Sequence, residues 1–564
     1  MNHFKTALSV ILILMLFSVS CNNSSKRGKP KLITNPEKID KLTSENIKET
    51  LEFALKNVGK IDDSISLQLA AVVNNFYTIT DFNNVWSQKE KWQPMADSML
   101  NFIQNASLSG LFPNDYHFQD LKSLKIKLDT DSLKRMDANL WTKADLMLTD
   151  GFMHLAKDLK DGRLGADSTS HKKPTPDSFF ITALSNLLSS KQLTPLIVEM
   201  EPKNLEYISL KNCLPKFIDS MDTKIYTYVK FPFKKNDSKD SLLFVKNIQK
   251  RLFEAKVINF INKLPDSLEL KTAVKFFQKQ QKIKQDGNIS SSLIKAMNLT
   301  DAERFKRIAI TLDRYKQLPD SMPEKYIWVN LPSYYLQVWD HDTLVLDSKI
   351  ICGKPATRTP LLTSFITDMV TYPTWTVPNS IIIKQYLPKL KNNPNYLSAI
   401  GLKLVDNKGE LVNPHDVNWS KYSKGIPYKV VQNSGDDNAL GILKFNFSNP
   451  FAVYLHDTNQ RYLFKNAGRA LSHGCVRVQE WDKLAYYIAK NDSLNLKVGD
   501  SLRYTTDSIK TWLANKEHKR ITVKNKVSLF ILYFSCVAKN GKIKFYDDIY
   551  GDDRIMREKY FAGK

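Results

Sequence analysis

The chain has 564 residues, which excludes a single ordinary domain and predicts about three or four structural units. Hydrophobic residues make up 42% of the chain, enough to build real cores. The formal net charge of +24 indicates acidic partners, and composition alone leaves nucleic acid, anionic lipid and a polyanionic wall polymer open.

The amino terminus indicates export. Lys5 supplies a short positive region, and residues 7–19 are nearly all apolar but too few for a comfortable membrane span. The run ends in Ser18-Val19-Ser20-Cys21, which resembles a bacterial lipoprotein box with Ser18 where leucine is usual. We predict a signal peptide over 1–20, lipidation of Cys21 and a membrane-anchored protein facing the periplasm. The alternative is a plain signal peptide or an uncleaved anchor helix. Export makes peptidoglycan a better acidic partner than nucleic acid.

The next two regions differ in pattern. Residues 21–45 are rich in Asn, Ser, Lys and Pro, which predicts a flexible tether. Residues 46–225 repeat apolar side chains at intervals of three and four, as at Leu51, Ala54 and Leu55, so we predict a helical domain.

A compact unit follows over 242–300. Its apolar spacing predicts three short helices, with a turn at Asp286-Gly287 before the third. The pattern Ala273-Val274-x-x-Phe277-Gln278 followed by Asp-Gly resembles the small three-helix peptidoglycan-binding module. A purely structural role for this unit is the alternative. Val274 and Phe277 are core residues in either case.

Residues 301–564 are predicted to form a mostly β domain. After a helix over 301–317, apolar runs predict strands over 326–330, 335–339 and 343–352. The pattern then breaks over 374–430, where Pro, Asn, Tyr and Lys predict a partly helical insertion. Further strands are predicted over 527–537 and 542–546. The acidic run 547–553 lacks the EF-hand spacing, so we interpret it as a turn.

Two segments, 455–458 and 471–478, carry the groups needed for nucleophilic acyl transfer. They contain the thiol of Cys475 and the imidazoles of His456 and His473. A thiolate attacks a carbonyl, an imidazole moves protons, and backbone N–H groups hold the oxyanion. Gly474 carries no Cβ, so the backbone there can approach a substrate closely. A single cysteine in an apolar neighbourhood is more often a small core residue, and one nearby histidine would not overturn that interpretation.

The spacing of this set is more specific than its composition. His456, fifteen intervening residues, then Ser472-His473-Gly474-Cys475 and Val476-Arg477 resemble the signature of the YkuD-type L,D-transpeptidases. The flanking segments 438–441, 454–458 and 469–472 resemble the large multidomain branch of that family, and so do segments of the helical domain around 148–164.

The resemblance implies an α+β multidomain fold. It comprises a helical scaffold domain, the three-helix module and a mostly β catalytic domain with a partly helical capping insertion. It also implies the activity: release of D-Ala from a tetrapeptide stem, a cysteine thioester, and transfer to an amine acceptor that gives 3→3 crosslinks in peptidoglycan. Carbapenem inhibition is implied as well.

The resemblance assigns Cys475 as nucleophile and His456 as the proton carrier, with Asp457 or a backbone carbonyl orienting its ring. His473 remains a rival base, because its side chain shares a face with Cys475 if the segment is extended. We expect Gly474 and Cys475 to supply oxyanion N–H groups and Ser472 to orient them.

Three further residues are candidates for binding substrate. Arg477 is expected to steady the thiolate or bind a substrate carboxylate, with an ordinary salt bridge as the alternative. Trp375 and Tyr428 of the insertion are candidate contacts for the stem peptide, although aromatic residues in such an insertion are more often core residues of the cap.

Other functions remain open from the sequence. Water as acceptor would make an L,D-carboxypeptidase or endopeptidase, and an amine-bearing protein would make a wall-attachment enzyme. A non-catalytic peptidoglycan-binding lipoprotein is the alternative of a different class. We expect no cofactor and no metal site, because the cysteines are widely spaced and the other seven of the nine histidines show no ligand spacing. Cys213, Cys352 and Cys536 lie in apolar surroundings and are predicted core residues.

Overall fold

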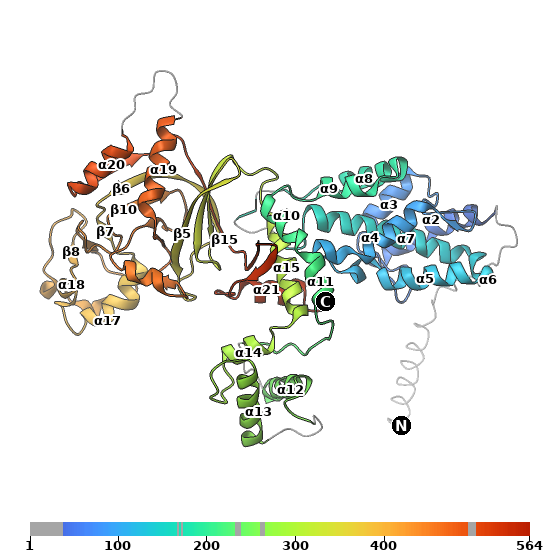
Figure 1. The fold of residues 1–564 in the computed structure, drawn as a ribbon, viewed down its shortest axis with the longest axis horizontal. Coiled ribbons are helices and arrows are strands. Elements are labelled where there is room, and N and C mark those ends of the chain that lie inside the picture. Colours follow the sequence, from blue (N-terminus) through green and yellow to red (C-terminus); the bar gives the residue numbers. More distant parts are fainter. Residues whose placement is uncertain (1–37, 166–168, 171–172, 232–237, 260–265, 495–503) are drawn as a thin grey trace, which may run out of the picture. The chain divides into compact units, whose positions relative to one another are not determined.

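The structure is a computed structural model that describes residues 38–165, 169–170, 173–231, 238–259, 266–494 and 504–564 (Figure 1). The predicted signal peptide and Cys21 lie outside these residues. The chain divides into two compact units. The first runs to Asn105 and adds Phe112–Lys157 and Pro176–Glu199; the second comprises Ala106–Leu111, Asp158–Thr175 and Met200–Lys564.

The first unit is helical, as the apolar periodicity predicts. Its helices are α2 (Ile39–Lys56), α3 (Ala70–Ile79), α4 (Pro94–Gln104), α5 (Phe118–Thr130), α6 (Ser132–Arg135), α7 (Ala138–Lys160), α8 (Asp177–Ser190) and α9 (Leu193–Met200). A short hairpin joins β1 (Ser87–Gln88) to β2 (Lys91–Trp92). The tether predicted to reach residue 45 is too long, because α2 begins at Ile39. Ile39, Thr43 and Ile47 recur at helical spacing and are buried, which places the first turns of α2 against the core.

Buried acidic side chains of α7 organise this unit. The Asp145 carboxylate accepts hydrogen bonds from the backbone N–H groups of Val85 and Trp86 at 2.9 and 3.0 Å and from the Tyr77 hydroxyl at 2.5 Å. Burial raises the pKa of Asp145 to about 6. Asp150 accepts the N–H of Leu69 at 2.8 Å just before α3, which satisfies a backbone donor at that helix's amino end. These contacts serve the packing of the helices.

The second unit includes two helices of the region 46–225, which is helical as predicted. They are α10 (Leu205–Asn212) and α11 (Leu214–Ser220). The cause is packing, since the buried Tyr207 of α10 meets Tyr315 of α15 (Asp301–Lys316) with ring centroids 6.3 Å apart.

The predicted three-helix module is present as α12 (Ser238–Glu254), α13 (Ser267–Gln280) and α14 (Ser291–Met297). Val274 and Phe277 lie in its core, as the sequence predicted. Val229 also belongs to that core, so the module's packing begins before residue 242. The Gln278 side chain binds the turn, accepting from the N–H of Gly287 at 2.8 Å and donating to Asp286 at 2.9 Å.

The β part of the second unit is built on a closed path of strands. Around the path the order is β10-β11-β13-β5-β4-β3-β15-β6, and β6 pairs in turn with β10. The bounds are β3 (Lys325–Asn330), β4 (Tyr335–Asp340), β5 (Thr343–Gly353), β6 (Leu362–Thr371), β10 (Leu443–Phe447), β11 (Leu455–His456), β13 (Val476–Val478) and β15 (Ser528–Leu532). β12 (Ala470–Ser472) pairs with β5, and β14 (Lys519–Thr522) pairs with β6. The three predicted strands 326–330, 335–339 and 343–352 are confirmed.

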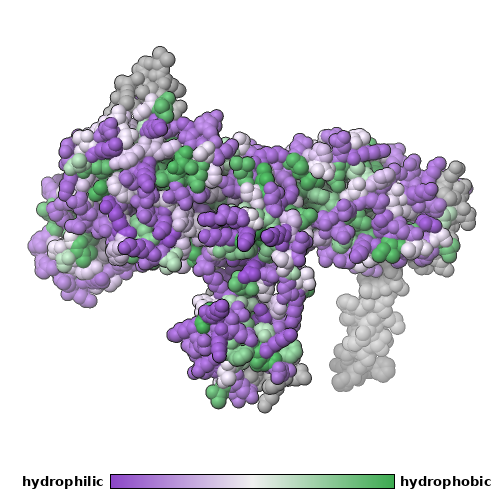
Figure 2. Space-filling model, viewed as in Figure 1, coloured by the Kyte–Doolittle hydropathy of each residue, from purple (hydrophilic) through white to green (hydrophobic). Residues whose placement is uncertain are grey.

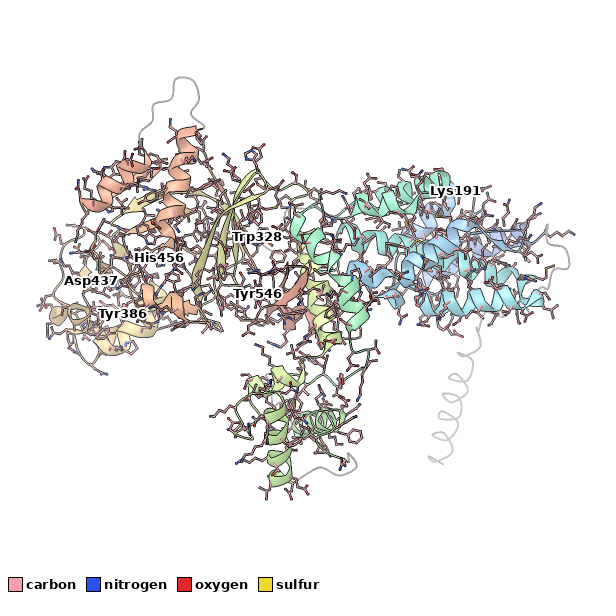
Figure 3. The ribbon with its side chains drawn as sticks, in the orientation of Figure 1. Lys191, Trp328, Tyr386, Asp437, His456 and Tyr546 are labelled. Carbon is pink, nitrogen blue, oxygen red and sulfur yellow. The ribbon has the colours of Figure 1, made fainter. Side chains whose placement is uncertain are left out.

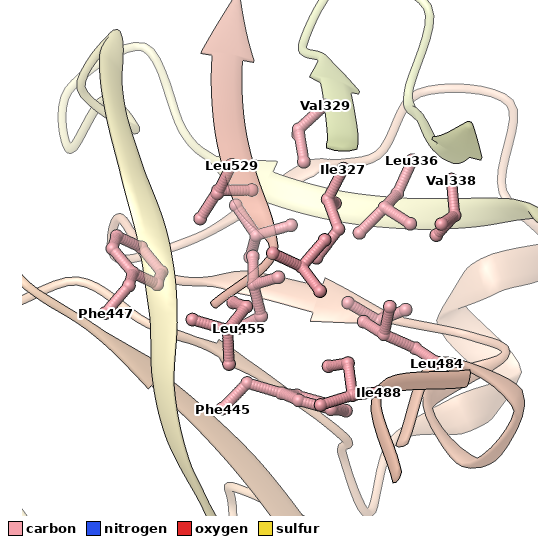
Figure 4. Packing of buried hydrophobic residues seen from close by; sticks show 14 of the residues in the cluster. Ile327, Val329, Leu336, Val338, Phe445, Phe447, Leu455, Leu484, Ile488 and Leu529 are labelled. Carbon is pink, nitrogen blue, oxygen red and sulfur yellow. The ribbon is translucent and has the colours of Figure 1, made fainter. Parts of the chain in front are cut away.

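Alternate side chains of these strands face one apolar core, because successive residues of a strand point to opposite faces. Figure 4 shows this packing, with Ile327, Leu336, Phe445 and Leu455 from four strands gathered beside Leu484 of the covering helix α19 (Trp481–Leu494). At about 25 cal/mol per Å² of buried apolar surface, this shared core is the main stabiliser of the domain. The opposite face of β10, β11 and β13 is left for polar residues.

The insertion has a core of its own. Its strands β7 (Trp375–Thr376), β9 (Lys429–Gln432) and β8 (Lys403–Val405) form a small sheet in that order. Its helical pieces are α16 (Asn379–Ile381), the π-helical η4 (Ile382–Tyr386), α17 (Leu387–Leu390) and α18 (Tyr396–Ala399). The buried apolar residues run from Val377 to Val430, which matches the predicted insertion of 374–430 closely.

The carboxyl-terminal segment differs from the prediction in one respect. The strand predicted over 527–537 is two strands, because β15 ends at Leu532 and β16 (Cys536–Lys539) pairs separately with β17 (Lys542–Phe545). The helices α20 (Thr506–Ala514) and α21 (Asp552–Tyr560) complete the unit. Asp548 caps α21 by accepting the N–H of Arg554 at 3.0 Å, in keeping with a turn. On the face shown in Figure 2, hydrophilic residues predominate and apolar residues are scattered. Among the helices described here, none combines the length and apolar character needed to cross a membrane.

Candidate active site

The polar groups singled out from the sequence lie on one face of three paired strands. In the parallel pair β11–β13, Leu455 stands opposite Val476 and His456 opposite Arg477. Leu455 and Val476 lie in the apolar core, so His456 and Arg477 point to the other face. Lys444 of β10 stands opposite His456 on its other side. His456 is therefore flanked by two cations.

Cys475 lies immediately before β13 and is half-buried. Burial raises the pKa of its thiol, and hydrogen bonds from the Tyr454 backbone and hydroxyl, together with the charges of Lys444 and Arg477, lower it again. The net shift is upward, so the resting group is a thiol, not a thiolate. A base is needed to activate it.

His456 is buried and lies among positive groups. Burial, then the charge of Arg477, lowers the pKa of its imidazole to about 3. Nearby backbone carbonyls of Asp457 and Leu440 act in the opposite direction, but the Nδ1 atom has no partner at hydrogen-bonding distance within the described chain. The ring is therefore neutral at physiological pH and able to accept a proton. Figure 3 shows His456 among the strands of the second unit.

Tyr454 connects these groups. Its ring meets the His456 ring edge-on with centroids 5.5 Å apart, and the Lys444 ammonium lies 4.0 Å from its centroid. Burial, followed by the Cys475 thiol, raises the pKa of the Tyr454 hydroxyl far above its ordinary value. That hydroxyl consequently keeps its proton and can donate it to sulfur in a hydrogen bond.

The turn before Cys475 is held by Ser472. The Ser472 hydroxyl donates to the Cys475 carbonyl at 2.6 Å and accepts the N–H of Gly474 at 3.1 Å. The Gly474 N–H is thus already engaged, which departs from its predicted place in an oxyanion hole. The Cys475 N–H has no partner in the part of the chain that the structure describes. The φ of Gly474 is +129°, a conformation that other residues rarely adopt.

A second layer of hydrogen bonds supports this turn from behind. The Thr359 hydroxyl donates to the Gly474 carbonyl at 2.8 Å and accepts the N–H of Gly353 at 2.9 Å. The Tyr550 hydroxyl donates to the Gly353 carbonyl at 2.8 Å and accepts the N–H of Thr359 at 3.1 Å. The carboxyl-terminal segment therefore contributes to the position of Cys475.

The two histidines occupy different environments. The segment 473–475 is bent, so His473 does not share an extended face with Cys475 as the sequence allowed. His473 is exposed, and its Nε2 lies against the amide of Gln385 in η4 of the insertion. Burial lowers the pKa of His473, and Lys354 and Arg477 add to that effect. His456 is the buried ring, and Tyr454 contacts both that ring and the Cys475 thiol, which favours His456 as the base.

Asp457 does not orient the His456 ring through its carboxylate. The carboxylate points the other way, where it accepts the N–H of Ile442 at 3.1 Å and the Nε of Arg461 at 3.0 Å. Asp457 holds the turn before β10, and the backbone carbonyls described above are the groups beside the ring.

The predicted substrate-binding residues separate into two groups. Arg477 donates to the Gln460 side chain at 3.0 Å and forms no salt bridge with any described residue, while its buried Nε has no partner there. Trp375 is half-buried and donates a hydrogen bond to the Tyr454 hydroxyl, which lowers that group's pKa against the larger opposing effect of burial. Tyr428 pairs with Tyr422 and packs on the insertion's own core. The structure brings Arg477 and Trp375 to the site and leaves Tyr428 in the cap.

Sequence reasoning missed Tyr454, Lys444, Gln385, Thr359 and Tyr550. Strand alternation could have found Tyr454, because it lies two residues before His456 and so shares its face. Lys444, Thr359 and Tyr550 reach the site through pairings and contacts across many residues, which no local pattern reveals.

The other described cysteines lie in the interior of the fold. Cys213, Cys352 and Cys536 are buried free thiols. In the described ranges, no group of three or more His, Cys, Asp or Glu side chains could hold a metal ion.

Comparison with known proteins shows which families parts of the chain match. Residues 324–498 match the family profile of the L,D-transpeptidase catalytic domain, named YkuD, and residues 71–214 match a scaffold domain profile. A Haemophilus influenzae protein, named a candidate L,D-transpeptidase, is 36% identical over 249 residues, which is 44% of this chain and 48% of that protein. The chain therefore spans about half the length of this curated relative.

Solved structures give weaker similarities. An L,D-transpeptidase from Mycobacterium smegmatis is 15% identical, with 29% of this chain and 53% of that one covered and a TM-score of 0.17. The catalytic domain of an Enterococcus faecium L,D-transpeptidase acylated by ertapenem is 12% identical, with 38% and 99% covered and a TM-score of 0.18. TM-scores this low support no structural argument. The two profile matches and the curated relative establish that the chain carries a YkuD-type L,D-transpeptidase catalytic domain, which follows a helical scaffold domain in the sequence.

Proposed function

We propose that the protein is a cysteine-dependent L,D-transpeptidase that forms 3→3 crosslinks between peptidoglycan stems and releases D-Ala. The observation that carries this proposal is that Tyr454 contacts both candidate groups within the matched catalytic domain: its hydroxyl hydrogen-bonds the Cys475 thiol, and its ring centroid lies 5.5 Å from that of His456. A thiol beside a neutral imidazole and a backbone donor is suited to acyl transfer.

The first half-reaction forms an acyl-enzyme. His456 takes the thiol proton as the Cys475 sulfur attacks the carbonyl that precedes the terminal D-Ala of a tetrapeptide stem. The Cys475 N–H donates to the resulting oxyanion, and the Tyr454 hydroxyl donates to the sulfur before it attacks. The imidazolium then gives its proton to the leaving nitrogen, the C–N bond breaks, and D-Ala departs from a thioester.

The second half-reaction transfers the acyl group. The side-chain amine of a third residue on another stem attacks the thioester, and His456 accepts its proton. The C–S bond breaks, the sulfur recovers the proton from His456, and the new amide joins the two stems. The ring of His456 is neutral in the resting site and so has a nitrogen free to take a proton, and the negative charge that develops on the substrate favours the imidazolium that forms.

Four further properties belong to the same proposal. The protein is a periplasmic lipoprotein anchored through Cys21, residues 242–300 bind peptidoglycan, and nucleic acid is not a partner. Carbapenems acylate Cys475, because a strained β-lactam carbonyl is attacked by the same thiol.

The test uses purified tetrapeptide muropeptides and mass spectrometry, with Cys475→Ala as the matched control. The proposal predicts dimers joined 3→3 with loss of D-Ala, absent from the control. Tripeptide monomers alone would instead assign an L,D-carboxypeptidase. Reaction only when an amine-bearing protein is added would assign a wall-attachment enzyme. Identical, unreacted samples would leave a non-catalytic peptidoglycan-binding lipoprotein.

A further inference from the structure

We infer that Lys444 and Arg477 form a carboxylate-binding subsite beside Cys475, and that its ligand is the carboxylate of the terminal D-Ala of the donor stem. This inference rests on the proposed function and adds a residue, Lys444, that determines which donors the enzyme accepts.

The placement of the two cations comes from strand register. Lys444 of β10 and Arg477 of β13 stand opposite His456 on its two sides, so all three side chains share one face of the sheet. The Lys444 ammonium lies 4.0 Å from the centroid of the Tyr454 ring, whose hydroxyl reaches the Cys475 thiol. The two charges therefore border the point of attack.

Neither cation is neutralised by the protein in the part of it described here. Arg477 has one side-chain partner, the neutral amide oxygen of Gln460 at 3.0 Å, and its buried Nε has none. Lys444 forms no ion pair there, although a charge on Cys475, and after it the charge of Asp368, acts to raise its pKa. The Asp368 carboxylate is already engaged by the Asn446 amide at 2.7 Å and by Arg520 at 3.1 Å.

Holding two cations without counter-ions is costly. Burial lowers the pKa of both Lys444 and Arg477, which shows that each loses solvation in this position. Half-buried charges of this kind are retained where an anion binds them, because a charge-assisted pair recovers the lost solvation. The adjoining thiol is neutral at rest, so the anion must come with the substrate.

The donor supplies an anion at the required place. In a tetrapeptide stem the carboxyl carbon of D-Ala is two bonds from the scissile nitrogen. Once Cys475 meets the scissile carbonyl, that carboxylate must lie close to the sulfur. A carboxylate on the side chain of the third residue is several bonds further away. The D-Ala carboxylate is therefore the ligand that fits the two flanking cations.

The alternative is that Lys444 only stabilises the developing thiolate. The two roles differ in what they discriminate. A carboxylate subsite separates donors that end in a carboxylate from donors that end in an amide, and it acts mainly on KM. A thiolate-stabilising charge affects every donor equally and shifts the pH dependence of thiol reactivity.

The experiment compares the full chain, purified in detergent, with Lys444→Met and with Lys542→Met, a matched change at an exposed lysine of β17. Donors are the tetrapeptide with a free terminal carboxylate and the same peptide ending in D-Ala amide. We expect Lys444→Met to lower kcat/KM for the carboxylate donor by about tenfold or more, mostly through KM, because charged hydrogen bonds are of this size. The amide donor should lose only the smaller part that comes from the Lys444 charge on the Cys475 thiol, so the ratio of the two kcat/KM values should fall, and Lys444→Arg should restore the preference.

Equal losses on both donors, together with a shifted pH profile for Cys475 alkylation, would overturn the subsite. Donors with diaminopimelate as third residue carry a side-chain carboxylate, and donors with lysine do not. If the loss caused by Lys444→Met depended on that carboxylate, the assignment to D-Ala would be overturned. Calorimetric binding of both donors to the Cys475→Ala chain keeps the inference separate from catalysis. If Lys444→Met weakens binding of the carboxylate donor to the Cys475→Ala chain, the subsite is supported even if no crosslink forms. If binding of that donor is unchanged, the subsite is rejected even if crosslinks do form.

Discussion

His456 stands directly opposite Arg477 in the parallel pairing of β11 with β13. A buried imidazole beside a guanidinium resists a second positive charge, and its pKa falls to about 3 through burial first and Arg477 second. Arg477, which the sequence suggested as a substrate ligand, is thus also part of what keeps the His456 ring neutral. This coupling makes the pH behaviour of the protein predictable.

We predict that His456 makes the fold sensitive to acid. Its pKa is about 3 when folded and about 6.5 when unfolded, so between these values the unfolded state holds more protons. Stability from this residue is fully present above pH 6.5 and is lost progressively as the pH falls toward 3, by up to about 4 kcal/mol. His456→Gln should flatten the fall in the free energy of unfolding between these pH values, measured by urea denaturation.

The control for this prediction is His341→Gln, an exposed histidine in the turn after β4. Its variant should follow the wild-type pH dependence. A His456→Gln chain that loses stability in acid as steeply as the wild type would contradict the account of a neutral buried ring.

We predict that Tyr454 promotes the reactivity of the nucleophile. Burial raises the pKa of the Cys475 thiol above its ordinary value of 9.0, and the Tyr454 hydroxyl counteracts this by donating to sulfur. Tyr454→Phe should therefore raise that pKa further and slow iodoacetamide alkylation of Cys475 at pH 8 by about threefold to tenfold. Peptide mass mapping follows the adduct at Cys475.

The matched change is Tyr396→Phe on α18 of the insertion, which should leave the alkylation rate unaltered. Faster alkylation of the Tyr454→Phe chain would mean that the hydroxyl shields the sulfur instead of assisting it.

We predict that Tyr550 positions the nucleophile from the carboxyl-terminal segment. Tyr550→Phe removes the hydroxyl that bridges the Gly353 carbonyl and the Thr359 N–H, and Thr359 in turn holds Gly474. Leaving those buried groups unpaired should cost about 1–3 kcal/mol of stability. The acylation rate should fall about tenfold while KM changes little, because the turn loses its fixed geometry.

Stopped-flow acylation by a carbapenem gives this rate separately from binding. Tyr533→Phe provides a comparison, since its hydroxyl bonds Asp548 and the Tyr550 N–H one step further from the turn. If both variants lost stability equally and neither lost acylation rate, the contact would serve the fold alone.

We predict that Gly441→Ala destabilises the domain strongly. Gly441 has a φ of +64°, and an added Cβ would overlap the Asp457 carboxylate that holds this turn. Overpacking and strain of this kind cost about 2–4 kcal/mol. Gly409→Ala is the control, because Gly409 also has a positive φ of +92° but open space around it. Thermal unfolding should separate the two, and equal melting temperatures would show that Asp457 can move aside.

Much of the architecture could be predicted from the sequence because it depends on local periodicity. The alternation of apolar residues identified the strands that contain Tyr326 to Cys352, and the helical spacing identified the module around Val274. The start of α2 was missed because Asn, Lys and Pro just before it suggest a tether, although the face formed by Ile39, Thr43 and Ile47 is apolar enough to pack. The start of α2 therefore depends on the burial of these residues in the folded unit.

The residues of the site likewise fall into those that a local sequence pattern predicts and those that depend on tertiary contacts. Cys475, His456 and Arg477 lie in one recognisable pattern of spacing, so sequence reasoning reached them. Whether the Gly474 N–H is already bonded, and which way the Asp457 carboxylate points, depend on hydrogen bonds that residue spacing does not specify. Lys444 lies beside His456 because of the strand register, which is set by pairing between distant segments.

The most direct test of the central claim is the intact mass of the protein during reaction with a tetrapeptide muropeptide, followed by peptide mapping. The account predicts a thioester at Cys475 that carries the tripeptide muropeptide, with one D-Ala released for each acylated chain. It predicts no adduct and no D-Ala from Cys475→Ala. Release of D-Ala that persists in that variant, or an adduct on any other residue, would contradict the account.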